Sequence, residues 1–465
     1  MPKSKIVCTI GPASQSEEQL RQLIQAGANV VRLNFSHGTQ EEHAHIIARV
    51  RRIAGQLDVP VAILQDLAGP KVRIGTFTNG SITLTAGSSF TLTTRLVAGT
   101  EHLVSISYAQ LPQEVRSGDT LLLADGAVIL EVRQVTTEDI HCHVVVGGTL
   151  SAHKGVNCPS GLFKLPILNA KDLADLQFGI DQQLDYIGLS FVRTAEDIDI
   201  AKSAIAQRGG SIPLIAKIET QAALSHIDDI IAAADGVMVA RGDLGIETPF
   251  ARVPLVQKQL IAKANQQAKP VITATQMLWS MVNAPRPTRA EAADVANAVL
   301  DGTDALMLSE ETAVGRYAVQ AVQAMAAIAR EAEHSASPLL TSQDHEQEGV
   351  PAEAELMARA ACQIAAARKL EAIVTVTLEG TSARLVAKYR PSQPIFAATP
   401  RVETYRRLSL IRGVTPLLLP PDITTREEMI ATAKERTRDV NSLARTVIVF
   451  SSVSAEHNML FTDQV

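Results

Sequence analysis

Acidic and basic side chains stand directly after short apolar segments of this chain, and their types point to phosphoryl or enolate chemistry. Glu219 and Asp243 follow two such segments, and paired carboxylates suit Mg²⁺ that keeps waters and takes its other ligands from substrate. Lys217 lies two residues before Glu219, so in a strand both side chains face the same way. An ammonium group beside a metal stabilises a transferring phosphoryl group or an enolate oxygen. Surface acids and a neutralising salt bridge are the alternative interpretation.

A second polar group surrounds the end of an apolar run near residue 32. Arg32, Asn34, Ser36 and His37 combine cationic and neutral donors, a set that suits phosphate oxygens. Buried polar partners inside a protein core are the alternative for these four residues.

Gly242 precedes Asp243 directly after another apolar run. A glycine there would let the backbone approach a ligand, and a short helix opening would offer N–H groups to an anion. An ordinary turn also needs glycine, so this signal is weak alone. Four more polar residues end or follow other runs: Asp66, Thr275, Ser309 and Glu311.

Eight compact apolar runs must position these residues. They do not alternate with polar residues, as expected for parallel strands buried on both faces. Helix-starting signals lie between them, such as Thr39 three residues before Glu42 and Thr288 before Glu291. This order predicts an α/β fold, a (β/α)₈ TIM barrel with its chemistry at the carboxyl ends of the strands. The runs are residues 5–10, 29–35, 61–67, 186–191, 214–218, 236–240, 270–275 and 305–308.

The spacing of the runs predicts two further domains. About 120 residues separate the third run from the fourth, too many for a structureless loop. Residues 69–164 show alternation and Asn-Gly and Asp-Gly turns, which predicts an inserted all-β lid domain. The barrel would then comprise residues 1–68 and 165–335. Residues 336–465 alternate helices and strands after a polar linker, which predicts a C-terminal α/β doubly wound domain.

Composition excludes several classes of protein. The 465 residues are 46% hydrophobic and 20% charged, with a net charge of −6, which argues against a disordered chain, a nucleic-acid binder and a membrane-surface protein. No run reaches the ~18 apolar residues of a membrane span. The first residues lack the apolar core of a secretory signal, so we expect a cytoplasmic protein. Four scattered cysteines without a CxxC pair indicate reduced thiols.

Several ordered blocks of the sequence closely resemble the pyruvate kinase family. The resemblance covers residues 3 to about 335 and, more weakly, the rest of the chain. It implies a glycolytic transferase that moves a phosphoryl group from phosphoenolpyruvate to ADP, giving pyruvate and ATP. It also implies an allosteric homotetramer. The blocks are residues 5–12 (KIVCTIGP), 31–38 (VRLNFSHG), 216–219 (AKIE), 238–247 (MVARGDLGIE), 274–278 (ATQML), 285–291 (PRPTRAE) and 294–302 (DVANAVLDG).

The resemblance also implies roles for single residues. Glu219 and Asp243 would hold the divalent cation, Mg²⁺ or Mn²⁺, and Lys217 would neutralise the moving phosphoryl group and the enolate. Arg32 would hold the phosphoryl group, and the amides of Gly242 and Asp243 would meet the substrate carboxylate.

Two further sets of residues follow from the same resemblance. Thr275 and Ser309 would line the face where the enolate is protonated, with Glu311 nearby. The contacts to the nucleotide phosphates would be Asn34, His37, Arg73 and, from the lid, Lys154.

Lys71 is the first departure from the family pattern. The family often has a glutamate there and binds K⁺ nearby, whereas this chain has a lysine. We therefore expect the Lys71 ammonium to replace the monovalent ion, which argues against a K⁺ requirement; an exposed lysine is the alternative. The equivalents of the K⁺ ligands are Asn34, Ser36, Asp66 and the carbonyl of Leu67.

The C-terminal domain carries the second departure. A loop that resembles the family's effector-binding loop has Glu379 where a small residue is usual, and a carboxylate repels phosphate. We therefore expect weak or no activation by fructose 1,6-bisphosphate. Residues 451–460 also lack the usual glycine-rich effector segment. Trp279, Glu310 and Cys158 depart from matching blocks without a physical reason in the sequence. The loop residues are Thr377, Glu379, Gly380, Thr381 and Ser382.

Two other functions compete with this interpretation. A Mg²⁺-dependent barrel lyase or aldolase that acts on pyruvate or phosphoenolpyruvate would use a similar acid pair, but it would need no His37, Arg73 or lid. A non-enzymatic effector-binding protein would not need every expected catalytic position to be filled.

Overall fold

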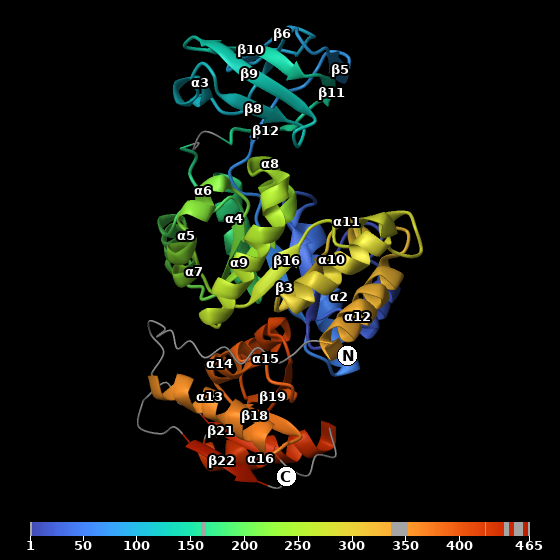
Figure 1. Ribbon diagram of the computed structural model, residues 1–465, viewed down its shortest axis with the longest axis vertical. Helices are drawn as coiled ribbons and strands as arrows, with labels where there is room; N and C mark the ends of the chain where they lie inside the picture. The colour runs from blue at the N-terminus through green and yellow to red at the C-terminus, as the bar shows by residue number, and fades with distance from the viewer. Residues whose placement is uncertain are drawn as a thin grey trace.

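The computed structural model shows three parts stacked along the longest axis of the molecule (Figure 1). The structure describes residues 2–159, 164–335, 352–423, 425–440, 446–450 and 459–463. A β-rich domain lies at one end, a barrel in the middle and an α/β domain at the other end. No helix in these ranges is long and apolar enough to cross a membrane.

Eight parallel strands close the central barrel, as the sequence predicted. Their order around the barrel is β1-β17-β16-β15-β14-β13-β3-β2. Nearly all strand residues are buried, which is why the runs showed no alternation. The strands are β1 (Lys5–Thr9), β2 (Val30–Asn34), β3 (Ala62–Asp66), β13 (Tyr186–Leu189), β14 (Leu214–Ile218), β15 (Gly236–Ala240), β16 (Val271–Ala274) and β17 (Ala305–Leu308).

Helices surround the barrel and carry the start signals seen in the sequence. The side chains of Thr39 and Thr288 accept hydrogen bonds from Glu42 and Glu291 as complete capping boxes. The helices are α1 (Glu17–Ala26), α2 (Gln40–Leu57), α4 (Ala170–Asp181), α5 (Ala195–Gln207), α6 (Gln221–Ser225), α7 (Ile227–Ala233), α8 (Arg241–Glu247), η1 (Phe250–Arg252), α9 (Val253–Gln266), η2 (Trp279–Val282), α10 (Arg289–Leu300), α11 (Glu310–Ala313) and α12 (Ala318–Ser335).

The inserted domain leaves the barrel after β3, at the carboxyl ends of the strands. This domain has its own apolar core, which includes Phe90 and Leu121 and is distinct from the core of the barrel. A seven-stranded sheet has the order β4-β12-β8-β9-β10-β6-β7, and β11 pairs with β5. Its elements are β4 (Val72–Arg73), β5 (Ser81–Leu84), β6 (Ser89–Thr93), β7 (Leu103–Ser105), α3 (Leu111–Glu114), β8 (Thr120–Leu123), β9 (Val128–Val135), β10 (Asp139–Val146), β11 (Gly148–Ser151) and β12 (Gly155–Asn157).

The C-terminal domain is an α/β sheet of order β20-β19-β18-β21-β22. Its last strand runs antiparallel to β21; the sequence pattern did not reveal it. Of the segment 451–460, residues 451–458 lie outside the described residues. The elements are α13 (Ala352–Ala367), β18 (Ala372–Val376), α14 (Thr381–Lys388), β19 (Ile395–Thr399), α15 (Val402–Arg407), η3 (Leu408–Leu410), β20 (Val414–Leu418), α16 (Arg426–Val440), β21 (Thr446–Phe450) and β22 (Met459–Asp463).

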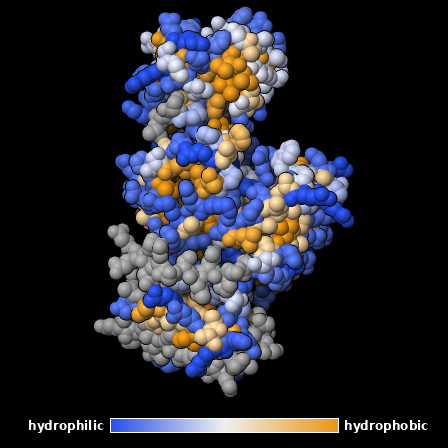
Figure 2. Space-filling view, in the orientation of Figure 1, coloured by the Kyte–Doolittle hydropathy of each residue, from blue (hydrophilic) through white to orange (hydrophobic). Residues whose placement is uncertain are grey.

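The face of the molecule in Figure 2 is mostly hydrophilic, with hydrophobic residues gathered in separate patches on each part. The four cysteines, Cys8, Cys142, Cys158 and Cys362, are buried thiols outside any disulfide. The polar surface agrees with the 20% of charged residues, and the cysteines agree with the reduced thiols expected from their spacing.

A buried ion pair joins the C-terminal domain to the amino-terminal end of the barrel. Both terminal nitrogens of Arg390 donate to Asp304, at 2.8 and 2.9 Å, and the two side chains are 7% and 3% exposed. Asp304 also accepts from the backbone of Arg412 at 3.2 Å. The pair therefore fixes the chain after α14 against the residue that precedes β17.

We expect Arg390→Leu to lower the free energy of unfolding by about 3 kcal/mol, because it leaves Asp304 buried without its partner. Urea denaturation measures the change. The exposed Arg368→Leu is the matched control and should stay within about 0.5 kcal/mol of the parent. Equal stabilities of the two variants would contradict the role given to the ion pair.

Candidate active site

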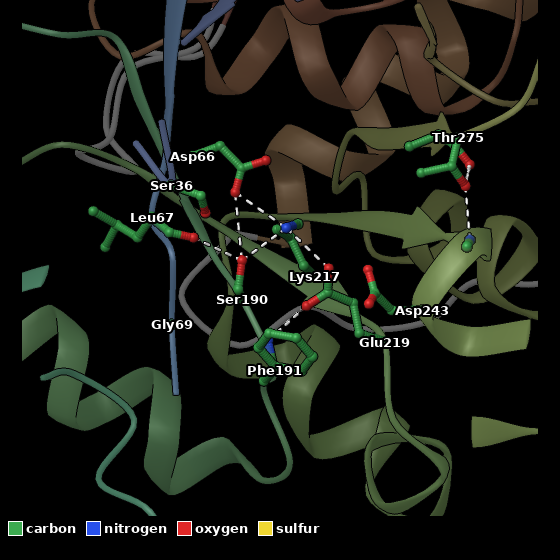
Figure 3. A network of polar contacts seen from close by, with 12 residues as sticks. Ser36, Asp66, Leu67, Gly69, Ser190, Phe191, Lys217, Glu219, Asp243 and Thr275 are labelled. Carbon is green, nitrogen blue, oxygen red and sulfur yellow. Dashed lines mark hydrogen bonds and ion pairs between the residues drawn. The ribbon is translucent and has the colours of Figure 1, made fainter. Parts of the chain in front are cut away.

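Lys217 is the centre of a network of charged groups at the carboxyl ends of the barrel strands (Figure 3). Its Nζ lies 2.9 Å from Glu219 Oε1 and 3.1 Å from Asp66 Oδ1. It also donates to Ser190 Oγ at 2.7 Å. These partners come from the ends of β3, β13 and β14, so closing the barrel is what brings them together.

Burial and charge together set the protonation of this network. Burial opposes the charge of Lys217, but Asp66 and Glu219 outweigh it and raise the pKa of Lys217 above its usual value. Burial tends to raise the pKa of the Asp66 carboxyl group. The positive charges of Arg32 and Lys217 outweigh this effect, so the pKa is lowered. Lys217 is therefore a permanent cation, suited to stabilise negative charge and not to accept a proton.

Glu219 carries negative charge that its neighbours do not fully balance. Burial raises its pKa to about 7; Lys217 lowers the pKa and nearby Asp243 raises it. The second carboxylate oxygen of Glu219 accepts from the backbone N–H of Phe191 at 2.7 Å. Figure 3 shows the Glu219 and Asp243 carboxylates beside each other. A divalent cation would relieve their repulsion.

Glu219 and Asp243 suit Mg²⁺ or Mn²⁺, which can take their other ligands from water and substrate. They do not suit a metal whose ligands all come from the protein. No cluster of three or more histidine, cysteine, aspartate or glutamate side chains suited to a metal occurs in the described ranges. Two carboxylates leave most positions of an octahedral ion to water and substrate, as is usual for Mg²⁺ in phosphoryl transfer. The donor set therefore matches a metal that acts together with a phosphorylated ligand.

Arg32 joins the network from β2. Its Nε lies 2.6 Å from Asp66 Oδ2, and its Nη1 donates to Thr9 Oγ1 at 3.0 Å. Only part of the guanidinium is used by these contacts, so the remaining N–H groups are available to an anion.

Lys71 reaches the network from the connection to the lid. Its Nζ lies 3.5 Å from Asp243 Oδ1 and 5.7 Å from the centroid of the Phe191 ring. It therefore adds positive charge beside Asp243, and it is not an isolated surface lysine. No direct contact joins it to the expected K⁺ ligands within the described part of the chain.

Three of the expected K⁺ ligands already form hydrogen bonds or ion pairs with other residues. Asn34 Oδ1 accepts from the backbone of exposed Ser36 at 3.1 Å. The carbonyl of Leu67 accepts from Ser190 Oγ at 2.8 Å. Asp66 is held by Arg32 and Lys217 as described above.

Thr275 and Gly242 meet where β15 and β16 end. Gly242 N–H donates to Thr275 Oγ1 at 2.7 Å. Thr275 and Gln276 have φ of 72° and 54°, and such positive values are strained for residues other than glycine. Arg241 supports this turn by donating to the Thr275 carbonyl at 2.8 Å.

Glu311 is buried, and its carboxylate is used by the backbone. It accepts from Ser309 N–H at 2.7 Å and from Leu278 N–H at 3.0 Å. Ser309 Oγ is buried without a hydrogen-bond partner among the described residues. Glu311 thus orients the loops after β16 and β17, on which Thr275 and Ser309 stand.

Trp279 and Glu310, unexplained from the sequence, are partners in space. Trp279 Nε1 donates to Glu310 Oε2 at 3.1 Å across the two loops. The two departures thus form one polar contact on the surface of this rim. Cys158 is buried in the lid core, and nothing in the structure explains that substitution.

The expected nucleotide contacts come from two domains, the barrel and the lid. Asn34 and exposed His37 follow β2 on the barrel. Arg73 and Lys154 are exposed on the lid, where Arg73 pairs with Gly155 and donates to the carbonyl of His153 at 2.9 Å. The backbones of Arg73 and Lys154 therefore lie on neighbouring segments of the lid.

The loop of the C-terminal domain carries a partly neutralised glutamate. Glu379 forms an ion pair with Arg401. Thr377 Oγ1 accepts from Gly380 N–H at 2.9 Å, and Gly380 has a φ of 82°, which suits glycine. Thr381 starts α14 and Ser382 is buried.

Sequence reasoning missed Ser190 and Phe191 as members of the site. Ser190 links Lys217 to the Leu67 carbonyl, and Phe191 supplies its N–H to Glu219. A polar residue at the end of the fourth apolar run was a signal for Ser190. The positive φ of Phe191, 58°, had no signal in the sequence.

Comparisons with known proteins agree with this geometry. The family model described as the pyruvate kinase barrel domain matches residues 1–322, and the pyruvate kinase alpha/beta domain matches residues 355–460. A relative named pyruvate kinase 2 from Synechocystis is 48% identical, over 100% of this chain and 79% of its own length. A pyruvate kinase from Thermotoga maritima is 42% identical, over 90% of this chain and 89% of its own.

A solved structure leads to the same family. The crystal structure of a pyruvate kinase from Cryptosporidium parvum matches with a TM-score of 0.91 and 36% identity, over 100% of this chain and 96% of that one. The relatives are phosphotransferases, which does not favour a lyase or aldolase. The barrel with its charged strand ends, the two family models and these relatives show that the chain belongs to the pyruvate kinase family.

Proposed function

We propose that this enzyme transfers a phosphoryl group from phosphoenolpyruvate to ADP, giving pyruvate and ATP. The observation that carries the proposal is the position of Lys217 between Asp66 and Glu219, with Arg32 and Asp243 beside it. This set offers cations to a phosphoryl group and carboxylates to a divalent metal at one point. Membership of the family supports the same reaction.

In the proposed reaction, the bond between phosphorus and the enolate oxygen breaks while a nucleotide phosphate oxygen attacks. Lys217 and Arg32 share the negative charge that the phosphoryl group and the enolate carry. Protonation of the enolate carbon then gives pyruvate. Thr275 and Ser309 stand on the rim where we place this proton transfer, and Glu311 is a positioning residue because the backbone uses its carboxylate.

Mg²⁺ or Mn²⁺, held by Glu219 and Asp243, would supply positive charge to the substrate oxygens. We assign the substrate carboxylate to the N–H groups of Gly242 and Asp243 at the start of α8, where the carboxylate would take the place of Thr275 Oγ1 as acceptor for Gly242. We assign Asn34, His37, Arg73 and Lys154 to the nucleotide phosphates, since cations and neutral donors suit phosphate oxygens.

Three finer features belong to the proposal. Lys71 supplies the charge that K⁺ supplies elsewhere in the family, so Asn34, Ser36, Asp66 and Leu67 need no monovalent ion. Glu379 disfavours fructose 1,6-bisphosphate as an allosteric effector. We expect a homotetramer in the cytoplasm.

Replacing Lys217 should remove most of the activity. We expect Lys217→Ala to lower the rate of ADP-dependent pyruvate release by a factor of roughly 10²–10³, the usual loss for a group that stabilises transition-state charge. Lys263→Ala removes a surface ion pair with Asp228 and should leave the rate unchanged. If Lys217→Ala is folded, by circular dichroism, and keeps most of the rate, the assignment is wrong.

Replacing Lys71 should create a need for potassium. We expect the parent rate to change less than about twofold when K⁺ is exchanged for Na⁺, because the tethered ammonium already supplies the charge. Lys71→Glu should be slow in Na⁺ and should regain activity in K⁺. Steady-state turnover in matched buffers measures both. A parent enzyme that depends strongly on K⁺ would refute this part of the proposal.

Metal affinity should depend on pH around neutrality. Glu219 titrates near pH 7 in the metal-free protein, and a ligand carboxylate must lose its proton to bind. Below that pH the dissociation constant for Mn²⁺ should rise about tenfold per pH unit; well above it, the constant should be flat. Mn²⁺ titration followed by electron paramagnetic resonance measures this. Glu219→Gln should bind more weakly, without this dependence on pH.

A further inference from the structure

Two side chains at the root of the lid contact two side chains of one barrel helix, α8. Lys71 Nζ lies 3.5 Å from Asp243 Oδ1. Asn157 Nδ2 donates to Glu247 Oε1 at 2.9 Å. Figure 1 shows α8 at the end of the barrel that faces the lid, beside β12. The first contact belongs to the candidate active site, whereas the second has no part in the reaction proposed above.

The pairing of β4 with β12 explains why Lys71 and Asn157 reach the same helix. The two strands are antiparallel, with Val156 opposite Val72. Continuing this register by one residue sets Asn157 opposite Lys71, and side chains directly opposite in an antiparallel pair lie on one face. An ideal Cβ on Gly155 would meet Lys71 Cε at 2.6 Å, so the lysine side chain runs directly against the backbone of β12.

Asp243 and Glu247 lie on one face of α8. They are four residues apart, and residues at this spacing are neighbours on the surface of a helix. Burial raises the pKa of Glu247, the hydrogen bond with Asn157 lowers it, and nearby Asp243 raises it. The two carboxylates are therefore close enough to interact. A contact that fixes Glu247 also fixes the helical turn that carries Asp243.

Few apolar contacts hold α8 in place. Leu244 is the one buried residue among its seven, and a helix this short is not stable by itself. Arg241 ties the start of the helix to the barrel through Asp294, at 2.7 Å. Just after its end, Thr248 Oγ1 donates to Gln221 Oε1 at 3.3 Å. The shorter hydrogen bond with the lid is the other tie at this end.

The side chain of Asn157 is committed to this contact. It is 7% exposed. Glu247 is its one hydrogen-bond partner among the residues that the structure describes, because Asn157 Oδ1 is buried without a partner there. Burying an amide costs free energy that an apolar side chain of similar size would avoid. The contact with the barrel helix accounts for a buried amide at this position.

We propose that Asn157 and Glu247 are positioning residues, which hold α8 against the root of the lid and so keep Asp243 in place for the divalent cation. The inference rests on the metal role proposed for Asp243. Neither side chain needs to touch the metal, because each acts through the helix. Groups that support a metal ligand commonly change metal affinity by a factor of roughly 10–100. The root of the lid then contributes to metal binding through a neutral hydrogen bond as well as through the charge of Lys71.

Titration of the full-length protein with Mn²⁺, followed by electron paramagnetic resonance, tests the inference. We expect Asn157→Ala and Glu247→Ala each to raise the dissociation constant about tenfold, because each breaks the contact that supports Asp243. The double variant should bind Mn²⁺ about as weakly as Glu247→Ala alone, since both substitutions remove the same interaction. Effects that add in the double variant would overturn the proposal.

Glu247→Gln separates the hydrogen bond from the charge. It keeps an acceptor for Asn157 Nδ2 and removes the negative charge. We expect its dissociation constant for Mn²⁺ to stay near that of the parent and well below that of Glu247→Ala. Binding as weak as that of Glu247→Ala would assign the effect to charge and would overturn the proposal.

Asn157→Asp gives an opposite sign for the two explanations. It keeps the size of the side chain but replaces the donor with a carboxylate, which would repel Glu247. Charge alone would tighten Mn²⁺ binding, because a negative group is added near the cation. Loss of the hydrogen bond should weaken it. We expect the weaker binding, and tighter binding would contradict the positioning role.

Glu138→Ala is the matched control, because it removes an exposed carboxylate from the lid; it should bind Mn²⁺ as the parent does. Thermal melting shows whether each variant is folded. Parent-like affinity of Asn157→Ala and Glu247→Ala would overturn this inference alone. A parent that binds no Mn²⁺ would overturn the proposed metal site and this inference together. A parent that binds Mn²⁺ but releases no pyruvate from phosphoenolpyruvate and ADP would refute only the proposed reaction.

Discussion

The charge balance around Lys217 is the constraint on which the rest of the active site depends. One ammonium group contacts Asp66 and Glu219, which belong to different strands of the barrel. Removing either acid would leave the lysine buried without full compensation, and removing the lysine would leave both acids facing each other. The barrel makes the arrangement possible, because parallel strands deliver their ends to a single rim. Asp243 and the connection to the lid then lie at the edge of this centre.

Much of the fold and part of the site could be predicted from the sequence. The apolar runs at 214–218, 236–240 and 305–308 became strands with the same bounds, because strands buried on both faces leave a continuous apolar signal. The spacing of Lys217 and Glu219 predicted their common face for the same reason. These features depend on local pattern, which the sequence displays directly.

Features made by tertiary contact escaped prediction. Ser190 and Phe191 reach the site through a backbone turn in which Phe191 has a positive φ. No glycine at this position indicates such a turn in the sequence. The pairing of Glu379 with Arg401, like that of Trp279 with Glu310, joins residues distant in sequence. The antiparallel strand β22 follows residues 451–458, and only its partner β21 showed as a strand in the sequence.

The covalent attachment of the Lys71 ammonium affects how the charge near Asp243 depends on the salt in the medium. An exchangeable ion occupies its site only in proportion to its concentration in the medium, whereas the Lys71 ammonium beside Asp243 is part of the chain. The charge therefore cannot be lost by dilution or displaced by a competing salt. It is also anchored where the chain passes into the lid, two residues before Arg73. Any rotation of the lid would move this charge relative to Asp243, so the positive charge beside the two carboxylates depends on the position of the lid.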